Sequence, residues 1–133
     1  MDETRIRDMA EAYTAAWNSG SAQRVAGHYA ADGEIVINGG DPVRGRAALT
    51  EGFDAFYGDV PGLRIDCQGV RVAGPHAAYL WRLTGRHAGT GGAVDIEGWE
   101  EWDLVEDGDG AIRVKRSLGW FDAADYARQT GGA

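Results

Sequence analysis

Two long runs of alternating apolar and polar residues, at about 76–88 and 93–105, constrain the fold of this 133-residue chain more than any other feature. Between them lies the sequence Gly89-Thr90-Gly91-Gly92. Successive side chains of a β-strand point to opposite faces, and two alternating runs joined by a glycine-rich turn are typical of a β-hairpin. The sequence therefore predicts a long antiparallel hairpin in the second half of the chain.

The register of this hairpin follows from the position of its turn. With Thr90-Gly91 as a two-residue loop, antiparallel pairing assigns the facing residues of the two strands. One face is charged and is expected to meet water, with the pairs Arg86–Asp95, Thr84–Glu97 and Arg82–Trp99. The other face is apolar, with the pairs Tyr79–Trp102, Trp81–Glu100 and Leu83–Gly98. Glu100 is the one carboxylate on this apolar face.

A carboxylate on an apolar face is unusual, because burial of an unpaired charge is costly. Two interpretations of Glu100 are open. It lines a cavity, where burial raises its pKa, or it pairs with Arg116, whose charge lowers the pKa. The strand of Arg116 is apolar in the same phase, through Ile112, Val114, Leu118 and Trp120. Of the two outcomes we expect the raised pKa.

The first half of the chain has the 3.6-residue period of amphipathic helices. A helix over residues 3–18 carries one apolar stripe, formed by Ile6, Met9, Ala10, Tyr13, Ala16 and Trp17. Asp2 is expected to cap this helix, and Ser21 a short second helix that includes Val25 and Tyr29. A third helix opens at Gly45 and places on one face Leu49, Phe53, Phe56 and Tyr57.

Further strands are expected over residues 34–38, from residue 63 with a bulge at Gly69, and in a last segment that ends near Phe121. Asp122 then caps a short helix over residues 123–128. No repeat or linker interrupts the sequence, so we expect a single domain over residues 1–133. This order of elements indicates an α+β fold.

The charge balance limits the partners of this chain. A net charge of −8 argues against nucleic acid and anionic membranes, which both require clustered positive charge. The N-terminal residues lack the basic and apolar regions of a signal peptide, so we expect the cytoplasm. The three histidines are too scattered for a zinc site, and no nucleotide-binding motif is present. We therefore expect no metal and no cofactor.

Several short segments, in their order along the chain, carry a family resemblance: AYTAAWNSG at 12–20, HYAADGEIVI at 28–37, RGRAAL at 44–49, GWEEWDL at 98–104 and WFDAADY at 120–126. The chain resembles the nuclear transport factor two-like superfamily, in its SnoaL-like and ketosteroid isomerase-like branch. The resemblance implies a cystatin-like cone, in which a strongly curved, mostly antiparallel mixed sheet wraps around N-terminal helices and encloses one apolar pocket. It also implies a homodimer through the outer sheet face.

The resemblance also suggests roles for individual residues. Tyr13 falls where ketosteroid isomerase has the tyrosine of its oxyanion hole, and Glu100 falls where that enzyme has a protonated aspartate. The position of the general-base aspartate is held by Ile37, beside Asn38, and neither side chain can take a proton from carbon. Steroid isomerisation by that mechanism is therefore disfavoured. The superfamily alignment points Lys115 and Ser117 inward in place of Arg116.

Two functions remain open. The first is a cofactor-independent isomerase, cyclase or hydrolase that acts on an apolar carbonyl or epoxide compound, with Glu100 as the acid and Tyr13 as a second donor. The second is a ligand-binding or dimerisation domain without catalysis. In either case we expect the small apolar ligand to contact Trp17, Ile37, Asn38, Phe53, Tyr57, Tyr79, Trp81, Trp102 and Arg116.

Overall fold

The computed structural model describes residues 1–131 of the chain. The N-terminal half contains α1 (Glu3–Asn18), α2 (Ala22–Ala26), β1 (Tyr29–Ile37), β2 (Val43–Arg44) and α3 (Arg46–Asp59). The C-terminal half contains β3 (Arg64–Ala73), β4 (His76–Arg86), β5 (Ala93–Glu106), β6 (Ile112–Phe121) and α4 (Ala123–Gln129). The expected order of helices and strands is confirmed, with β2 as an addition that the sequence did not predict.

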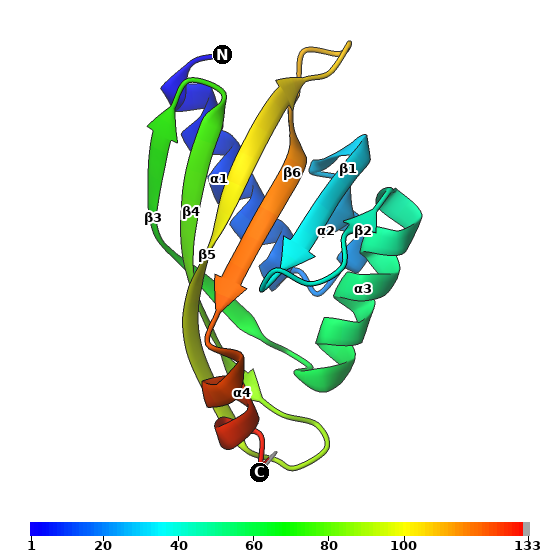
Figure 1. Ribbon diagram of the computed structural model, residues 1–133, viewed down its shortest axis with the longest axis vertical. Coiled ribbons are helices and arrows are strands. Elements are labelled where there is room, and N and C mark those ends of the chain that lie inside the picture. The colour runs from blue at the N-terminus through cyan, green and yellow to red at the C-terminus, as the bar shows by residue number, and fades with distance from the viewer. Residues whose placement is uncertain (132–133) are drawn as a thin grey trace.

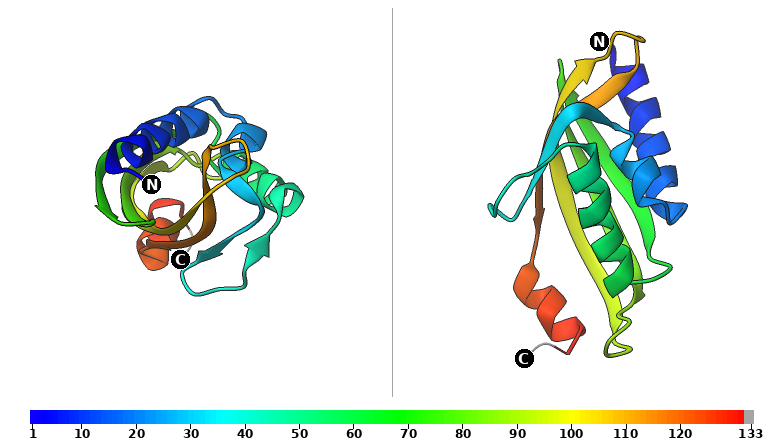
Figure 2. Two further views of the ribbon diagram at one scale, coloured as in Figure 1. Left: turned by 90° about the horizontal axis from the view of Figure 1, so that it is seen from above. Right: turned by 90° about the vertical axis from the view of Figure 1, so that its right-hand side faces the viewer.

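The six strands form one mixed sheet in the order β2-β1-β6-β5-β4-β3. Strands β1 and β6 run parallel, whereas all other neighbours run antiparallel. The sheet is strongly curved, and helices α1, α2 and α3 cover its concave side (Figures 1 and 2). The expected α+β architecture, a curved and mostly antiparallel mixed sheet around N-terminal helices, is therefore confirmed. The sheet does not close, and β2 and β3 are its edges.

Helix α1 follows the sequence pattern closely. Its buried residues are the six of the expected stripe: Ile6, Met9, Ala10, Tyr13, Ala16 and Trp17. The Asp2 side chain accepts a hydrogen bond from the Arg5 backbone N–H at 2.8 Å and so caps the helix. This stripe places Tyr13 and Trp17 against the concave face of the sheet, where the site lies.

The β4–β5 hairpin keeps the expected faces but not the expected register. Arg86 faces Ala93, Thr84 faces Asp95, and Tyr79 faces Glu100, so every pair is shifted by two residues. The reason is a longer loop: the Gly91 N–H donates to the carbonyl of His87 at 2.8 Å, which makes a four-residue turn of residues 88–91. A shift of two residues preserves the alternation of faces. Glu100 therefore still lies on the inner face.

Strand β6 departs from the expected alternation at a bulge. Asp103 of β5 pairs with Arg116, whereas Leu104 pairs with Val114, so Lys115 is an extra residue in β6. The bulge reverses the faces of all residues beyond it. Ser117 and Gly119 turn inward and are buried, whereas Arg116 is exposed on the outer side of the sheet.

Helix α4 covers a part of β5 that is paired with β4 on one side but has no strand neighbour on the β6 side. Strand β6 ends its pairing with β5 at Phe121, which faces Gly98. Beyond that point the side-chain amide of Gln129 takes the place of a strand, because it donates to the Asp95 carbonyl at 2.9 Å and accepts from the Asp95 N–H at 2.7 Å. The far end of the hairpin is thereby held beside the C-terminal helix.

Candidate active site: an apolar cavity with one buried carboxyl group

A cavity of about 110 Å³ lies between helices α1 and α3 and the concave face of the sheet. Its walls are mostly apolar side chains, with two glycines, Gly52 and Gly119. The aromatic residues of the wall are Trp17, Phe53, Phe56, Tyr79, Trp81, Trp120 and Phe121. The aliphatic residues are Ile35, Ile37, Val43, Leu49, Ile65 and Leu83. Among the residues that the structure describes, Glu100 is the one charged residue in this wall.

The Glu100 carboxyl group is held by four neutral donors from four different elements. Three of them converge on Oε1: the Ser117 hydroxyl at 2.7 Å, the Trp102 indole N–H at 3.0 Å and the Tyr29 hydroxyl at 3.3 Å. The Tyr13 hydroxyl lies 3.1 Å from both Oε1 and Oε2. Oε2 therefore has a single, shared partner. It is the oxygen with free capacity to exchange a proton with a ligand.

Burial controls the charge state of this carboxyl group. Glu100 is 7 % exposed, and desolvation raises its pKa above the ordinary value, because the charged form loses its hydration. Hydrogen bonds from Trp102, Ser117, Tyr13 and Tyr29 act in the opposite direction, since they stabilise the ionised form. Burial is the larger effect. No cation contributes, because none of the ion pairs within residues 1–131 includes Glu100.

The two phenols beside Glu100 do not ionise. Burial and the nearby carboxylate raise the pKa of Tyr13 and of Tyr29 well above the ordinary value. Both hydroxyls therefore remain protonated at any working pH. The Tyr13 and Tyr29 oxygens are also 3.1 Å apart, so the two phenols and the carboxyl group form one connected hydrogen-bond network.

Five of the predicted ligand-binding residues line the cavity: Trp17, Ile37, Phe53, Tyr79 and Trp81. Tyr13 and Trp102 lie behind the carboxyl group, fully buried. They contact Glu100 and do not belong to the cavity wall. Tyr13 is thus placed to orient Glu100, not to donate directly to a ligand. Trp102 stacks on Tyr79 with ring centroids 4.9 Å apart, which supports the wall from behind.

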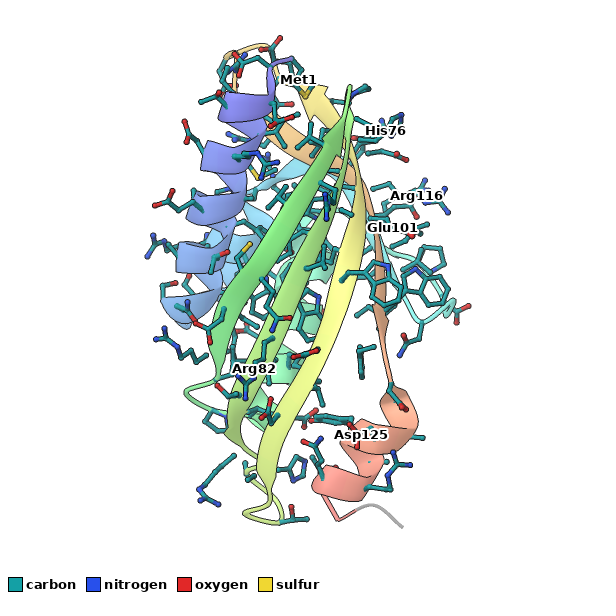
Figure 3. The ribbon with its side chains drawn as sticks, turned by 90° about the vertical axis from the view of Figure 1, so that its left-hand side faces the viewer. Met1, His76, Arg82, Glu101, Arg116 and Asp125 are labelled. Atoms are coloured by element: carbon teal, nitrogen blue, oxygen red, sulfur yellow. The ribbon has the colours of Figure 1, made fainter. Side chains whose placement is uncertain are left out.

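The remaining three predicted residues are engaged elsewhere. Asn38 lies outside the cavity wall, and its side-chain oxygen accepts from the Phe121 backbone N–H at 3.0 Å, which ties β1 to β6. Tyr57 is likewise outside it and donates to the Trp17 carbonyl at 2.7 Å. Arg116 was predicted to face inward or to pair with Glu100, and this prediction is wrong. Figure 3 shows Arg116 on the outer side of the sheet, together with Glu101 and His76.

Sequence reasoning did not assign Tyr29 and Ser117 to the site, although the superfamily alignment pointed Ser117 inward. Tyr29 was expected on the second helix, but it begins β1 instead. Its carbonyl accepts two hydrogen bonds from the Arg46 guanidinium, at 3.0 and 2.8 Å. The periodic pattern of β6 pointed to Arg116 because apolar residues continue in one phase through the bulge. The superfamily alignment was the signal available for the inward position of Ser117.

The chemistry available in this cavity is a single proton transfer. Glu100 can donate or accept one proton, and the Tyr79 hydroxyl, another polar group of the wall, is bonded to Thr14. No cluster of three or more metal-binding side chains was found within residues 1–131. In the same range, no helix has the length and apolarity needed to span a membrane.

Solved structures with this fold are numerous. A putative SnoaL-like polyketide cyclase from Jannaschia sp. CCS1 is 17 % identical with a TM-score of 0.82, over 96 % of this chain and 93 % of that one. A hypothetical protein with a ketosteroid isomerase-like fold from Catenulispora acidiphila, in complex with trimethylamine, is 16 % identical with a TM-score of 0.81, over 93 % and 92 %. TerC, co-crystallised with polyporic acid, is 14 % identical with a TM-score of 0.78, over 94 % and 97 %.

These structural similarities are accompanied by a match at the level of sequence families. No curated protein matches this chain in sequence. The family model of the SnoaL-like domain, however, matches residues 10–113, a span that runs from the middle of α1 to the start of β6. The protein is a member of the SnoaL-like domain family.

Proposed function

We propose that this protein binds a small apolar organic molecule in its cavity and transfers a proton to or from it through Glu100. The observation that carries this proposal is the position of one carboxyl group in a mostly apolar wall, with Tyr13 as the one, shared partner of its Oε2. Such a combination of an apolar cavity and one acid with a perturbed pKa is common in enzyme active sites. Neighbours of the same fold crystallised with small ligands support the binding role.

The proposed substrates are compact carbonyl or epoxide compounds. Neutral Glu100 would donate its proton to the carbonyl or epoxide oxygen, and the carboxylate formed would then accept a proton from the substrate or from water. Tyr13, Tyr29, Trp102 and Ser117 would stabilise that carboxylate while it exists. The cavity of about 110 Å³ is below the ~300 Å³ at which pockets for drug-sized ligands begin. This size favours a compact substrate over a four-ring steroid.

Proton transfer can be tested by deuterium exchange. Cyclohexanone and cyclohexene oxide are incubated with the protein in heavy water, and NMR detects deuterium at the α-carbon or formation of the diol. We expect turnover by the wild type and by Glu101→Gln, which changes an exposed carboxyl group on the other face of the same strand. Glu100→Gln should abolish it. Equal rates for Glu100→Gln and the wild type would refute the proposal.

A non-catalytic binding domain is the second candidate. The observation that favours it is the presence of Ile37, an apolar residue, in the cavity wall where the related isomerase carries its base. Without a second acid–base group, the cavity offers affinity more readily than bond rearrangement. Ligand-induced NMR shifts without any turnover, across the carbonyl and epoxide panel, would favour this candidate.

We also propose a homodimer that forms through the outer face of the sheet. Exposed apolar side chains gather there: Trp99 is 44 % exposed, and Leu80 and Trp120 are each 37 % exposed. Trp99 and Trp120 face each other on β5 and β6. Arg82 does not cover Trp99, because its guanidinium binds Asp95 at 2.8 and 2.7 Å. Light scattering at micromolar concentration should report a dimer, and a monomer would refute it.

A further inference from the structure

The cavity combines two features that together define a ligand class. Besides Trp120, whose side chain lies on the outer face of the sheet, six aromatic residues line its wall, contributed by α1, α3, β4 and β6. Glu100 is the single charged side chain in that wall among residues 1–131, and it is negative when ionised. No lysine, arginine or histidine of that range lines the cavity. An anionic ligand would therefore meet a carboxylate and no counter-charge.

The four partners of Glu100 stabilise its ionised form without neutralising it. Each of them donates one hydrogen atom to the carboxyl oxygens and carries no charge: two phenols, one hydroxyl and one indole N–H. When Glu100 is ionised, these hydrogen bonds leave its negative charge without a counter-charge. A positively charged ligand supplies the missing counter-ion, and Oε2, whose one partner is the shared Tyr13 hydroxyl, is the oxygen available to it.

The aromatic rings attract the same kind of ligand. The faces of indole and phenyl rings carry partial negative charge, and alkylated ammonium groups bind well among several such rings. Trp17 packs with Phe53 and Phe56, at centroid distances of 5.1 and 6.4 Å, and Trp81 packs with Phe121 at 6.2 Å. These contacts hold the rings in place on both sides of the cavity. The net charge of −8 also draws cations toward the protein.

From these observations we propose that the cavity binds a compact alkylammonium ion, with its nitrogen beside Glu100 and its alkyl groups against the aromatic wall. This inference rests on the proposed role of the cavity in small-molecule binding and names a class of ligand for it. The bound cation occupies the position of a neutral substrate and keeps Glu100 ionised. Alkylammonium ions are therefore also inhibitors of any proton donation by Glu100.

The test compares choline with 3,3-dimethylbutan-1-ol, which has the same shape but a neutral carbon in place of the nitrogen. Binding is followed through the Trp102 indole N–H resonance, because this group donates directly to Glu100. In the wild type we expect choline to bind at least about tenfold more tightly than the alcohol. Glu101→Gln should keep this preference, since its side chain lies on the outer face.

Two variants distinguish the contribution of the Glu100 charge to ligand affinity from the contribution of the cavity volume. Glu100→Gln should remove the preference, so that both compounds bind with similar affinity. Gly119→Ala should weaken both compounds, because a methyl group there enters the cavity wall at ordinary contact distance, 3.9 Å from Ile37. The comparison within the wild type needs no variant, so it holds even if Glu100→Gln fails to fold.

The outcomes distinguish this inference from the proposed function. If the wild type binds the alcohol as tightly as choline, the ammonium inference is overturned while small-molecule binding stands. A choline preference that persists in Glu100→Gln also overturns it, because Glu100 is then not the counter-ion. If neither compound shifts the Trp102 resonance at any concentration, both the inference and the small-molecule role of the cavity fail.

Discussion

Glu100 and Glu101 are consecutive residues of β5, yet their environments are opposite. Glu100 points into the cavity, has four neutral hydrogen-bond donors and is nearly inaccessible to water. Glu101 lies on the outer face among other charged side chains (Figure 3). The same side chain is thus a perturbed acid on one face and an ordinary surface group on the other. The difference arises from one step of strand alternation and from the layer of helices that covers the concave face.

The tryptophans of β5 repeat this contrast. Trp102 is 1 % exposed, stacks on Tyr79 and donates to Glu100, whereas Trp99 is 44 % exposed on the outer face. Both are large apolar residues, but one belongs to the core and the other to a surface. Substitutions on the two faces of one strand therefore separate the contributions of packing, cavity and surface.

The largest change in the free energy of unfolding is expected for a substitution on the inner face. Trp102→Ala should lower the free energy of unfolding by about 3–5 kcal/mol, because it leaves a void beside Tyr79 and removes a donor to Glu100. Trp99→Ala should change it by no more than ~0.5 kcal/mol in the monomer. Urea unfolding at a low protein concentration measures both. Equal losses for the two variants would contradict the assignment of faces.

The second-largest loss in the free energy of unfolding is expected at Gly98, because this residue lies on the inner face beneath Trp81. A Cβ atom at this position would lie 2.5 Å from the Trp81 ring and 2.3 Å from the Trp120 carbonyl. Gly98→Ala should therefore destabilise the protein by about 1–3 kcal/mol. Gly119→Ala is the matched control, because its Cβ meets neighbours only at 3.9 Å or more, and it should cost less. Thermal or urea unfolding distinguishes the two.

The pH dependence of Glu100→Gln tests the charge state. Because the pKa of Glu100 is raised in the folded protein, both side chains are neutral below the unfolded pKa of about 4.3, and there the wild type and Glu100→Gln should differ little in stability. As pH rises from that value to the folded pKa, the wild type should lose stability relative to Glu100→Gln, by about 1.4 kcal/mol for each unit of the shift. Above the folded pKa the wild type should be the less stable of the two proteins.

Urea unfolding of both proteins from pH 4 to pH 8 checks this sign. If Glu100→Gln is instead destabilised by several kcal/mol at neutral pH, ionised Glu100 has a stabilising role that burial alone does not explain. The stability of the wild type relative to Glu100→Gln would then increase with pH instead of decreasing.

The smallest effect is expected for Glu101→Gln. An exposed residue with no hydrogen-bond partner among the described side chains should change the free energy of unfolding by less than ~0.5 kcal/mol. The same urea series measures it. A loss comparable to that of Trp102→Ala would mean that the outer face is packed against something in solution.

The sequence predicted the parts of the fold that depend on local patterns. The stripe of α1, its Asp2 cap and the inward phase of Glu100 all follow from periodicity over a few residues. The bulge in β3 was also expected near Gly69, and the register does shift between Cys67 and Gly69. These features need no information from distant parts of the chain.

The predictions from the sequence were wrong where tertiary contacts determine the strand register or the face on which a side chain lies. The register of the β4–β5 hairpin depends on its loop, and the Ala88 N–H donates to the Asp59 carbonyl of α3 at 2.8 Å. The bulge at Lys115 sends Arg116 outward and Ser117 inward, although Leu118 and Trp120 continue the apolar pattern of Ile112 and Val114. That pattern misleads because the outer face of the sheet is itself apolar at these positions.

In the site, too, one residue could be predicted from a local pattern and the others could not. Glu100 was identified from alternation alone, whereas its four partners come from α1, β1, β5 and β6. Tyr29 begins a strand that pairs in parallel with β6, a contact between segments far apart in the sequence. No short-range pattern predicts such a contact.

The most direct test of this account is the titration of the Glu100 side-chain carboxyl carbon by NMR, with its resonance assigned by its absence in Glu100→Gln. The account predicts a midpoint clearly above the ordinary glutamate value of about 4.3, because burial outweighs the four hydrogen bonds. A saturating alkylammonium ion should lower that midpoint. A midpoint at or below about 4.3 in the free protein would contradict the claim that Glu100 is a desolvated, uncompensated acid in an apolar cavity.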